Sequence, residues 1–150
     1  DMRKWLLALL GNEPGTINQQ VLKSITTPQI NTPLPWRYTH RWDGLENKYY
    51  SLGWRIYQYK GRKIIYHGGY VRGYRAEIAF CPQEQTGIAF LQNSPNGVAA
   101  KCVPSFFKMY INALQENANE EVEIASHDSP KPIPHQTFSP ENFRTGLIPY

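Results

Sequence analysis

The stretch from Tyr66 to Asn93 reads YHGGYVRGYRAEIAFCPQEQTGIAFLQN, and it decides the fold class of the chain. Runs of apolar and aromatic residues alternate with glycine-rich breaks, a pattern typical of short strands joined by turns. It predicts strands over 62–67, 74–80 and 87–92, and working outward, an earlier strand over 49–59. Connections this short force neighbouring strands to run antiparallel. We therefore expect a β-meander whose apolar face must be covered by helices.

Apolar residues spaced three and four apart predict three helices that flank these strands. The expected helices cover residues 1–11, 18–25 and 97–115. For the third helix we expect an inner stripe made of Val98, Cys102, Phe106, Met109 and Leu114. Between the second helix and the strands, residues 26–47 predict a long loop anchored by Trp36 and Trp42. The predicted fold class is α+β, an antiparallel β-sheet meander flanked by helices.

Composition and charge indicate one packed domain followed by a different kind of segment. The chain has 150 residues, of which 41% are apolar, and it contains 4 Trp, 10 Tyr and 6 Phe. Residues 1–115 carry 14 Lys/Arg and 6 Asp/Glu (+8), whereas residues 116–150 carry 2 and 6 (−4). We expect a domain over 1–115 and an acidic, proline-rich tail over 116–150 that is extended or disordered. The basic residues are scattered singly, so we expect no nucleic-acid partner, and no apolar run is long enough to span a membrane.

The two cysteines predict neither a disulfide scaffold nor a metal centre. Cys81 and Cys102 do not form a C-x-x-C pair, and no Cys/His cluster has zinc-ligand spacing. We expect two buried thiols, and a single bridge between them stays open as the alternative. No cofactor and no metal are expected.

His67-Gly68-Gly69, placed between two strands, resembles the third active-site element of the serine β-lactamase and penicillin-binding-protein superfamily. That element is usually Lys-Thr-Gly, and His-x-Gly in several class C-like branches. The downstream pattern GYRxxIAFxPxxxxGIxxLxN is similar to class C β-lactamases and S12 peptidases, and the opening DMRKWLLALLG resembles the helix after the family's Tyr-x-Asn element. The resemblance covers about residues 1–115 and implies part of a β-lactamase/transpeptidase-like α/β domain.

The resemblance also implies roles for individual residues. The backbone N–H of Tyr70 is expected to be one of two oxyanion-hole donors, and Gly69 is expected to be small so that a substrate carbonyl can approach the strand. His67 is expected to face the nucleophile as the third catalytic residue. Gly68 is expected to lie against substrate. Arg72, near the cleft mouth, is expected either to contact substrate or to be a solvated turn residue, and the sequence leaves both readings open. An imidazole titrates near pH 6.5 and a lysine ammonium near 10.4, so histidine at this position argues against a dedicated β-lactamase.

The family's nucleophile and its proton-transfer partners have no match before His67. Their patterns, Ser-x-x-Lys and Tyr-x-Asn, do occur later, as Ser105 to Lys108 and Tyr110 to Asn112. Both stand in the wrong order within one predicted helix, where Tyr110 points about 140° away from Ser105 at ~100° per residue. We interpret both as chance matches. The nucleophile is therefore expected on an upstream part of a longer protein.

These observations lead to two functional expectations. The first is a fragment of a serine hydrolase, inactive alone, whose intact parent hydrolyses an amide, ester or β-lactam through an acyl-enzyme, as a β-lactamase, esterase or D-amino-acid peptidase does. The second is a non-catalytic binding or assembly module on the same scaffold. Expected partners are a small-molecule or peptide-like substrate, the missing N-terminal part and a second copy of the chain. Family resemblance implies a periplasmic or secreted location.

Overall fold

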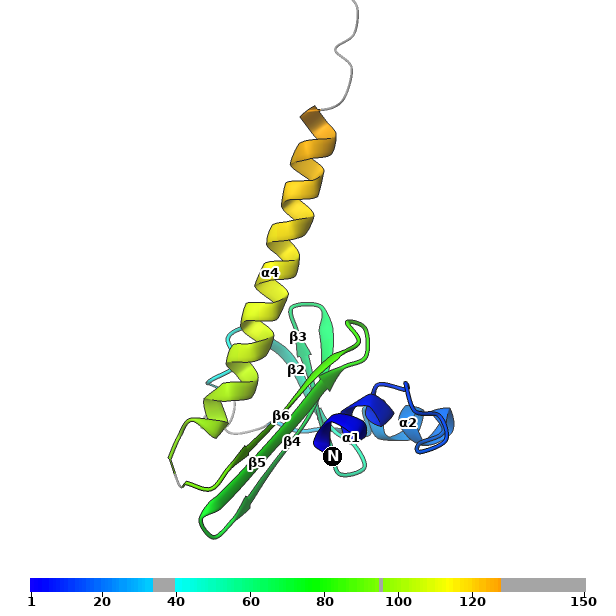
Figure 1. Cartoon of the computed structure of the whole chain (residues 1–150), viewed down its shortest axis with the longest axis vertical. Helices are drawn as coiled ribbons and strands as arrows, with labels where there is room; N and C mark the ends of the chain where they lie inside the picture. Colours follow the sequence, from blue (N-terminus) through cyan, green and yellow to red (C-terminus); the bar gives the residue numbers. More distant parts are fainter. Residues whose placement is uncertain (34–39, 95, 128–150) are drawn as a thin grey trace, which may run out of the picture. The chain divides into compact units, whose positions relative to one another are not determined.

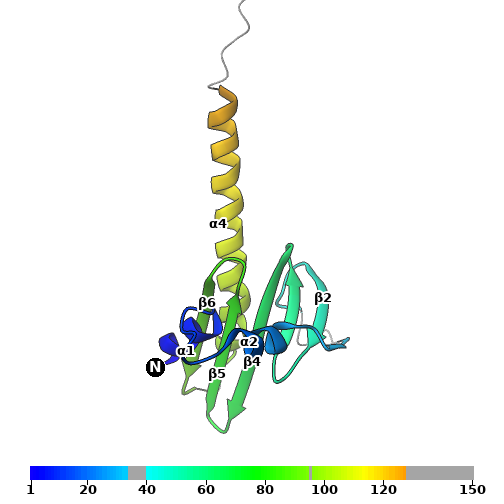
Figure 2. The same ribbon diagram turned by 90° about the vertical axis from the view of Figure 1, so that its right-hand side faces the viewer.

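The computed structural model describes residues 1–33, 40–94 and 96–127, with side chains described up to residue 122 (Figures 1 and 2). The chain divides into two compact units, Asp1–Gln115 and Glu116–Tyr150. The first unit contains the sheet and the helices that cover it. The described part of the second unit, residues 116–127, is helical. No described helix is both long and apolar enough to cross a membrane.

The first unit is built around an antiparallel meander, as the sequence predicts, with six strands where four were expected. Each strand pairs with the next in chain order, so the sheet order is β1-β2-β3-β4-β5-β6. The strands are β1 (Ile30–Asn31), β2 (Leu45–Tyr50), β3 (Arg55–Tyr59), β4 (Arg62–Val71), β5 (Tyr74–Cys81) and β6 (Thr86–Gln92). At the β3–β4 turn, Lys60 and Gly61 both have positive φ, 48° and 72°. Two consecutive positive φ values are the signature of the hairpin turn that matches strand twist.

The strands differ from the sequence prediction in three places. The expected loop over 26–47 contains β1 and the first residues of β2, because pairing with β2 and β3 holds these residues in extended conformation. The run 49–59 is two strands, because the chain turns at 51–54, where Gly53 has a φ of 80° and the Ser51 N–H donates to the Trp54 carbonyl at 2.8 Å. Strand β4 continues through Gly68 and Gly69 to Val71 instead of ending at His67. Glycine weakens a strand without ending it, and pairing with β5 holds these residues in extended conformation.

Alternation along the strands gives the sheet two apolar faces with separate cores. One face packs against α1 (Met2–Leu9) and α2 (Gln19–Thr26), and the other against α4 (Ala99–His127); Figure 1 shows α1 and α2 on the opposite side of the sheet from the first turns of α4. The α1/α2 core comprises Ala8, Leu9, Ile17, Ile56, Ile65 and Phe80. The α4 core comprises Trp42, Tyr57, Tyr59, Ile64, Ala79, Cys81, Val103, Phe107 and Ile111. Consecutive residues of a strand thus belong to different cores, since successive side chains point to opposite faces of the sheet.

Helix α4 confirms only part of the predicted stripe and extends further. Its buried apolar residues in this core are Val103, Phe107 and Ile111. Of the predicted residues, Phe106 packs half-buried against the same core, while Met109 is 73% exposed and Val98 55% exposed. The three buried residues repeat every fourth position, which keeps them on one face of a helix. The helix runs to His127, beyond the expected end at 115. Residues 116–122 are exposed there, so this stretch has no apolar stripe that the sequence pattern could have detected.

Two local expectations were more accurate. Trp42 is buried, and its ring meets Tyr57 and Tyr59 edge to face at 5.3 and 5.5 Å between centroids. Trp36, the second expected anchor, lies outside the described residues. Cys81 and Cys102 are free thiols; Cys81 is buried and Cys102 half-buried.

Candidate functional site

The site expected from the sequence lies on the last five residues of β4, which lack one strand neighbour. The register between β3 and β4 ends at Arg55 opposite Tyr66. From His67 to Val71 the strand pairs with β5 alone. Among the described residues, no strand pairs with the other edge of this segment. The result is an open backbone edge that includes His67, Gly68, Gly69 and Tyr70.

Strand alternation decides which backbone groups point to the open edge. Val71 and Tyr74 are paired directly across a two-residue turn, so they form a hydrogen-bonded pair of the antiparallel ladder. Such pairs alternate along a strand, and Gly69 therefore directs its backbone groups toward β5. The N–H and C=O groups of Gly68 and Tyr70 point the other way, to the open edge. The Tyr70 side chain is 66% exposed.

His67 is held at this edge by a contact with the turn at residues 51–54, between β2 and β3. Its Nδ1 lies 2.7 Å from the carbonyl oxygen of Gly53, and its ring meets Trp54 edge to face at 6.2 Å between centroids. Because a carbonyl oxygen only accepts, Nδ1 carries the proton and donates it. This contact fixes the orientation of the ring, whose other nitrogen is Nε2, on an exposed side chain.

The two glycines have different surroundings within the chain. A Cβ added at Gly69 would meet only the Ala76 carbonyl oxygen, at 3.9 Å, so nothing in the chain forbids a side chain there. A Cβ at Gly68 would collide with the Glu77 carboxylate and lie 2.7 Å from the Tyr66 hydroxyl oxygen. Of these two glycines, Gly68 is therefore the one where a side chain would clash with other residues of the chain.

Glu77 is the residue that the sequence analysis missed. It is only 1% exposed, it accepts a hydrogen bond from the Tyr66 hydroxyl, and its Oε1 accepts one from Arg75 Nε at 2.8 Å. Burial and the hydrogen bond to Glu77 both raise the pKa of Tyr66, which keeps the phenol protonated as a donor. The available signal was position: Glu77 alternates with Ala79 and Cys81, both buried on the α4-facing side of β5. A buried carboxylate needs such partners, so Glu77 ties β4 to β5 directly behind Gly68.

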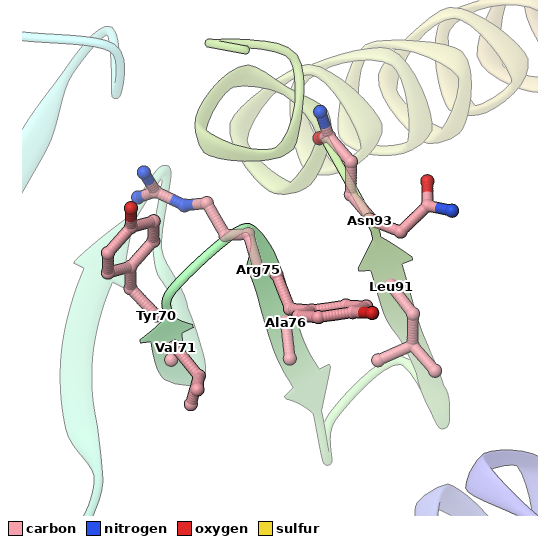
Figure 3. Close-up of a pocket in the computed structure, with 9 residues that line it drawn as sticks. Tyr70, Val71, Arg75, Ala76, Leu91 and Asn93 are labelled. Atoms are coloured by element: carbon pink, nitrogen blue, oxygen red, sulfur yellow. The ribbon is translucent and has the colours of Figure 1, made fainter. Parts of the chain in front are cut away.

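A pocket of about 440 Å³, here called the edge pocket, opens along the ends of β4, β5 and β6 (Figure 3). It is lined by Gly69, Tyr70, Val71, Tyr74, Arg75, Ala76, Leu91, Gln92 and Asn93. Figure 3 shows Tyr70 and Arg75 extending to one side of the strands and Val71 and Leu91 to the other. Arg72, at the β4–β5 turn, is exposed and does not line this pocket.

A second pocket of about 180 Å³ lies on the α4-facing side of the same edge. It shares Gly68, Gly69 and Tyr70 with the site, and we call it the arginine pocket because Arg41, Arg55 and Arg75 line it. No group of three potential metal ligands occurs among the described residues. The site therefore consists of the open backbone edge of β4, the apolar side chains that line the edge pocket and the guanidinium groups that line the arginine pocket.

The two later motif matches lie on α4 and are engaged in other contacts. Lys108 Nζ is 3.5 Å from Asp43 Oδ2, and Lys60 Nζ donates to Asn112 Oδ1 at 2.8 Å. Neither Ser105 nor Tyr110 lines the edge pocket or the arginine pocket. His67 instead faces the α1/α2 side, since it alternates with Ile65.

Comparison with known proteins gives a family for this scaffold. The β-lactamase family model matches residues 1–104 of the chain. The unguisins hydrolase ungD of Aspergillus violaceofuscus (strain CBS 115571) is 42% identical over 45 residues, which cover 30% of this chain and 8% of that protein. The chain thus spans under a tenth of the length of this relative, and no solved structure matches it significantly. With a match over most of the sheet-bearing unit, the chain belongs to the β-lactamase family.

Proposed function

We propose that this chain forms one wall of the active site of a serine hydrolase that cleaves an amide or ester through an acyl-enzyme. The family match and the name of the hydrolase relative support this reaction class. The observation that carries the proposal is the open edge of β4, where the backbone of Gly68 and Tyr70 points away from β5 beside a 440 Å³ pocket. A free backbone N–H on such an edge is what an oxyanion hole requires.

In this proposal each residue of the edge has one task. The Tyr70 N–H donates to the oxyanion that develops on the substrate carbonyl. His67, fixed by the contact of its Nδ1 with the Gly53 carbonyl, is the side chain of this edge that faces the nucleophile in the intact enzyme. Gly69 carries no side chain on the wall of the edge pocket, so a substrate chain can lie along the strand. The serine nucleophile comes from residues outside the 150 of this sequence, because neither Ser105 nor Tyr110 lines the edge pocket or the arginine pocket.

The backbone role of Tyr70 allows a sharp test in the full-length protein. Proline lacks an N–H and is tolerated where that group faces an open strand edge. We expect Tyr70→Pro to fold but to lose about 10²–10³ in kcat, as removal of one oxyanion donor typically does. Tyr70→Ala keeps the N–H and should retain most activity. The assays are acylation by a fluorescent penicillin and turnover of nitrophenyl esters, a chromogenic cephalosporin and unguisins.

The outcomes separate the enzyme from a non-catalytic module on the same scaffold. Equal activity of Tyr70→Pro and wild type would remove the oxyanion assignment. A full-length protein that is neither acylated nor active on any of these substrates would favour the module. Turnover by the 150-residue chain alone, abolished by Ser105→Ala, would show that the nucleophile lies on α4 and overturn the proposal.

A further inference from the structure

The arginine pocket combines positive charge with buried donors on the α4-facing side of the sheet. Its lining includes Arg41, Arg55 and Arg75, from the loop before β2, from β3 and from β5. Of these, Arg75 is paired with Glu77 at 2.8 Å. No ion pair among the described residues involves Arg41 or Arg55. Three guanidiniums against one carboxylate leave an excess of two positive charges at the pocket.

An unpaired tyrosine hydroxyl provides the second observation. Tyr57 lines the pocket and is 1% exposed as a residue, yet no hydrogen bond among the described residues uses its hydroxyl. The hydroxyl oxygen is not among the fully buried atoms that lack a partner, so the small exposed part of Tyr57 lies at the pocket, where a ligand or water can accept a hydrogen bond from it. Burial raises the pKa of Tyr57 to about 12, so the hydroxyl keeps its proton and can donate it.

The first turn of α4 adds a third kind of donor. Ala100 lines the same pocket. Around it, the N–H groups of Val98, Ala99, Lys101 and Cys102 all have acceptors, whereas no described hydrogen bond uses the N–H of Ala100. The N-terminus of a helix carries partial positive charge and favours anions. This helix end therefore supports the same ligand charge as the arginines.

We propose that the arginine pocket binds a tetrahedral oxyanion, a phosphate or sulfate group, held by Arg41, Arg55, the Tyr57 hydroxyl and the N–H of Ala100. Planar guanidiniums and helix N-termini are the donors that suit such groups. A volume of about 180 Å³ equals the share of about six water molecules at ~30 Å³ each, which accommodates one such group and its waters. The two pockets share Gly69, Tyr70 and Arg75, but the inference does not depend on the hydrolase proposal, because anion binding needs no nucleophile and is measured without turnover.

The test is isothermal titration of the full 150-residue chain with inorganic phosphate and with sodium sulfate, at ionic strength held constant with sodium chloride. We expect saturable binding of at least one of the two oxyanions. Arg55→Gln and Tyr57→Phe should each weaken it about tenfold or more, since a hydrogen bond to a charged group contributes about 1.5–3 kcal/mol. Arg3→Gln is the matched control, because Arg3 is an exposed arginine on α1 that lines neither pocket.

Folding of each variant is checked by circular dichroism and by thermal melting. Tyr57→Phe keeps the ring that stacks on Tyr66 at 5.7 Å between centroids, so it separates loss of the hydroxyl from loss of packing. Heat of binding no larger than that of chloride for both oxyanions would overturn the inference. An equal loss of affinity in Arg3→Gln and Arg55→Gln would also overturn it, because it would mean diffuse attraction to a basic chain.

Discussion

Replacing Gly68 with alanine is the most direct test of how Glu77 supports the open strand edge. The new Cβ would collide with the Glu77 carboxylate and lie 2.7 Å from the Tyr66 hydroxyl oxygen. Overpacking of this kind costs about 1–3 kcal/mol, and displacing the buried carboxylate from a donor costs about 1–3 kcal/mol more. Alanine within a strand is more stabilising than glycine by about 0.5–1 kcal/mol, which offsets part of this loss. We expect a net loss of about 2 kcal/mol or more in the free energy of unfolding.

Gly69→Ala is the matched control, because its Cβ meets only the Ala76 carbonyl oxygen at 3.9 Å. It should leave stability unchanged or raise it by up to about 1 kcal/mol. Urea denaturation followed by circular dichroism measures both variants, and melting should fall by roughly 8 °C for Gly68→Ala at about 4 °C per kcal/mol. The double variant Gly68→Ala/Glu77→Ala should lose at least about 1 kcal/mol less than the two single losses added together. Equal stability of the two alanine variants, or strict additivity, would refute the reasoning.

Three further predictions concern buried groups. Glu77→Gln should lower the free energy of unfolding by about 2–4 kcal/mol in urea denaturation, because it leaves Arg75 without its counter-charge. The pKa of Tyr57 is raised from 10.0 to about 12 by burial, so the unfolded chain loses that proton first and stability should fall as pH rises from 10 toward 12. Tyr57→Phe should show a shallower alkaline loss in the same denaturation series. Burial raises the pKa of both thiols, so both should react slowly with a disulfide reagent in the native chain, and half-buried Cys102 should react before buried Cys81.

The sequence predicted the architecture well where the signal is local. Short turns, such as Lys60-Gly61, are enough to impose antiparallel order, and the strands follow one another in the sheet in chain order as expected, although there are six of them and not the four predicted. The first two helices lie within one residue of the expected starts, at Met2 and Gln19. Their apolar spacing is read directly from neighbouring residues.

The prediction was weaker where the local sequence is compatible with more than one structure and tertiary packing determines which one forms. The run 97–115 contains two overlapping apolar stripes, and only contact with Tyr57 and Trp42 selects the one through Phe107. The run 49–59 has aromatic residues on both sides of Gly53, and the turn at 51–54, where Gly53 has a positive φ, became apparent only in the structure. Which stripe is buried, and where a strand breaks, depend on partners far away in the chain.

The sequence by itself determined the family, the antiparallel order of the strands and the segment around His67 that carries the candidate site. The packing of distant segments leaves the edge from His67 to Val71 open, places the intrachain Cβ clash at Gly68 and not at Gly69, and buries Glu77 behind that edge. The physical reason is that an edge is open or closed according to where the neighbouring strand begins. Here β3 begins at Arg55, after a turn more than ten residues earlier in the chain, and no pattern within β4 records that position.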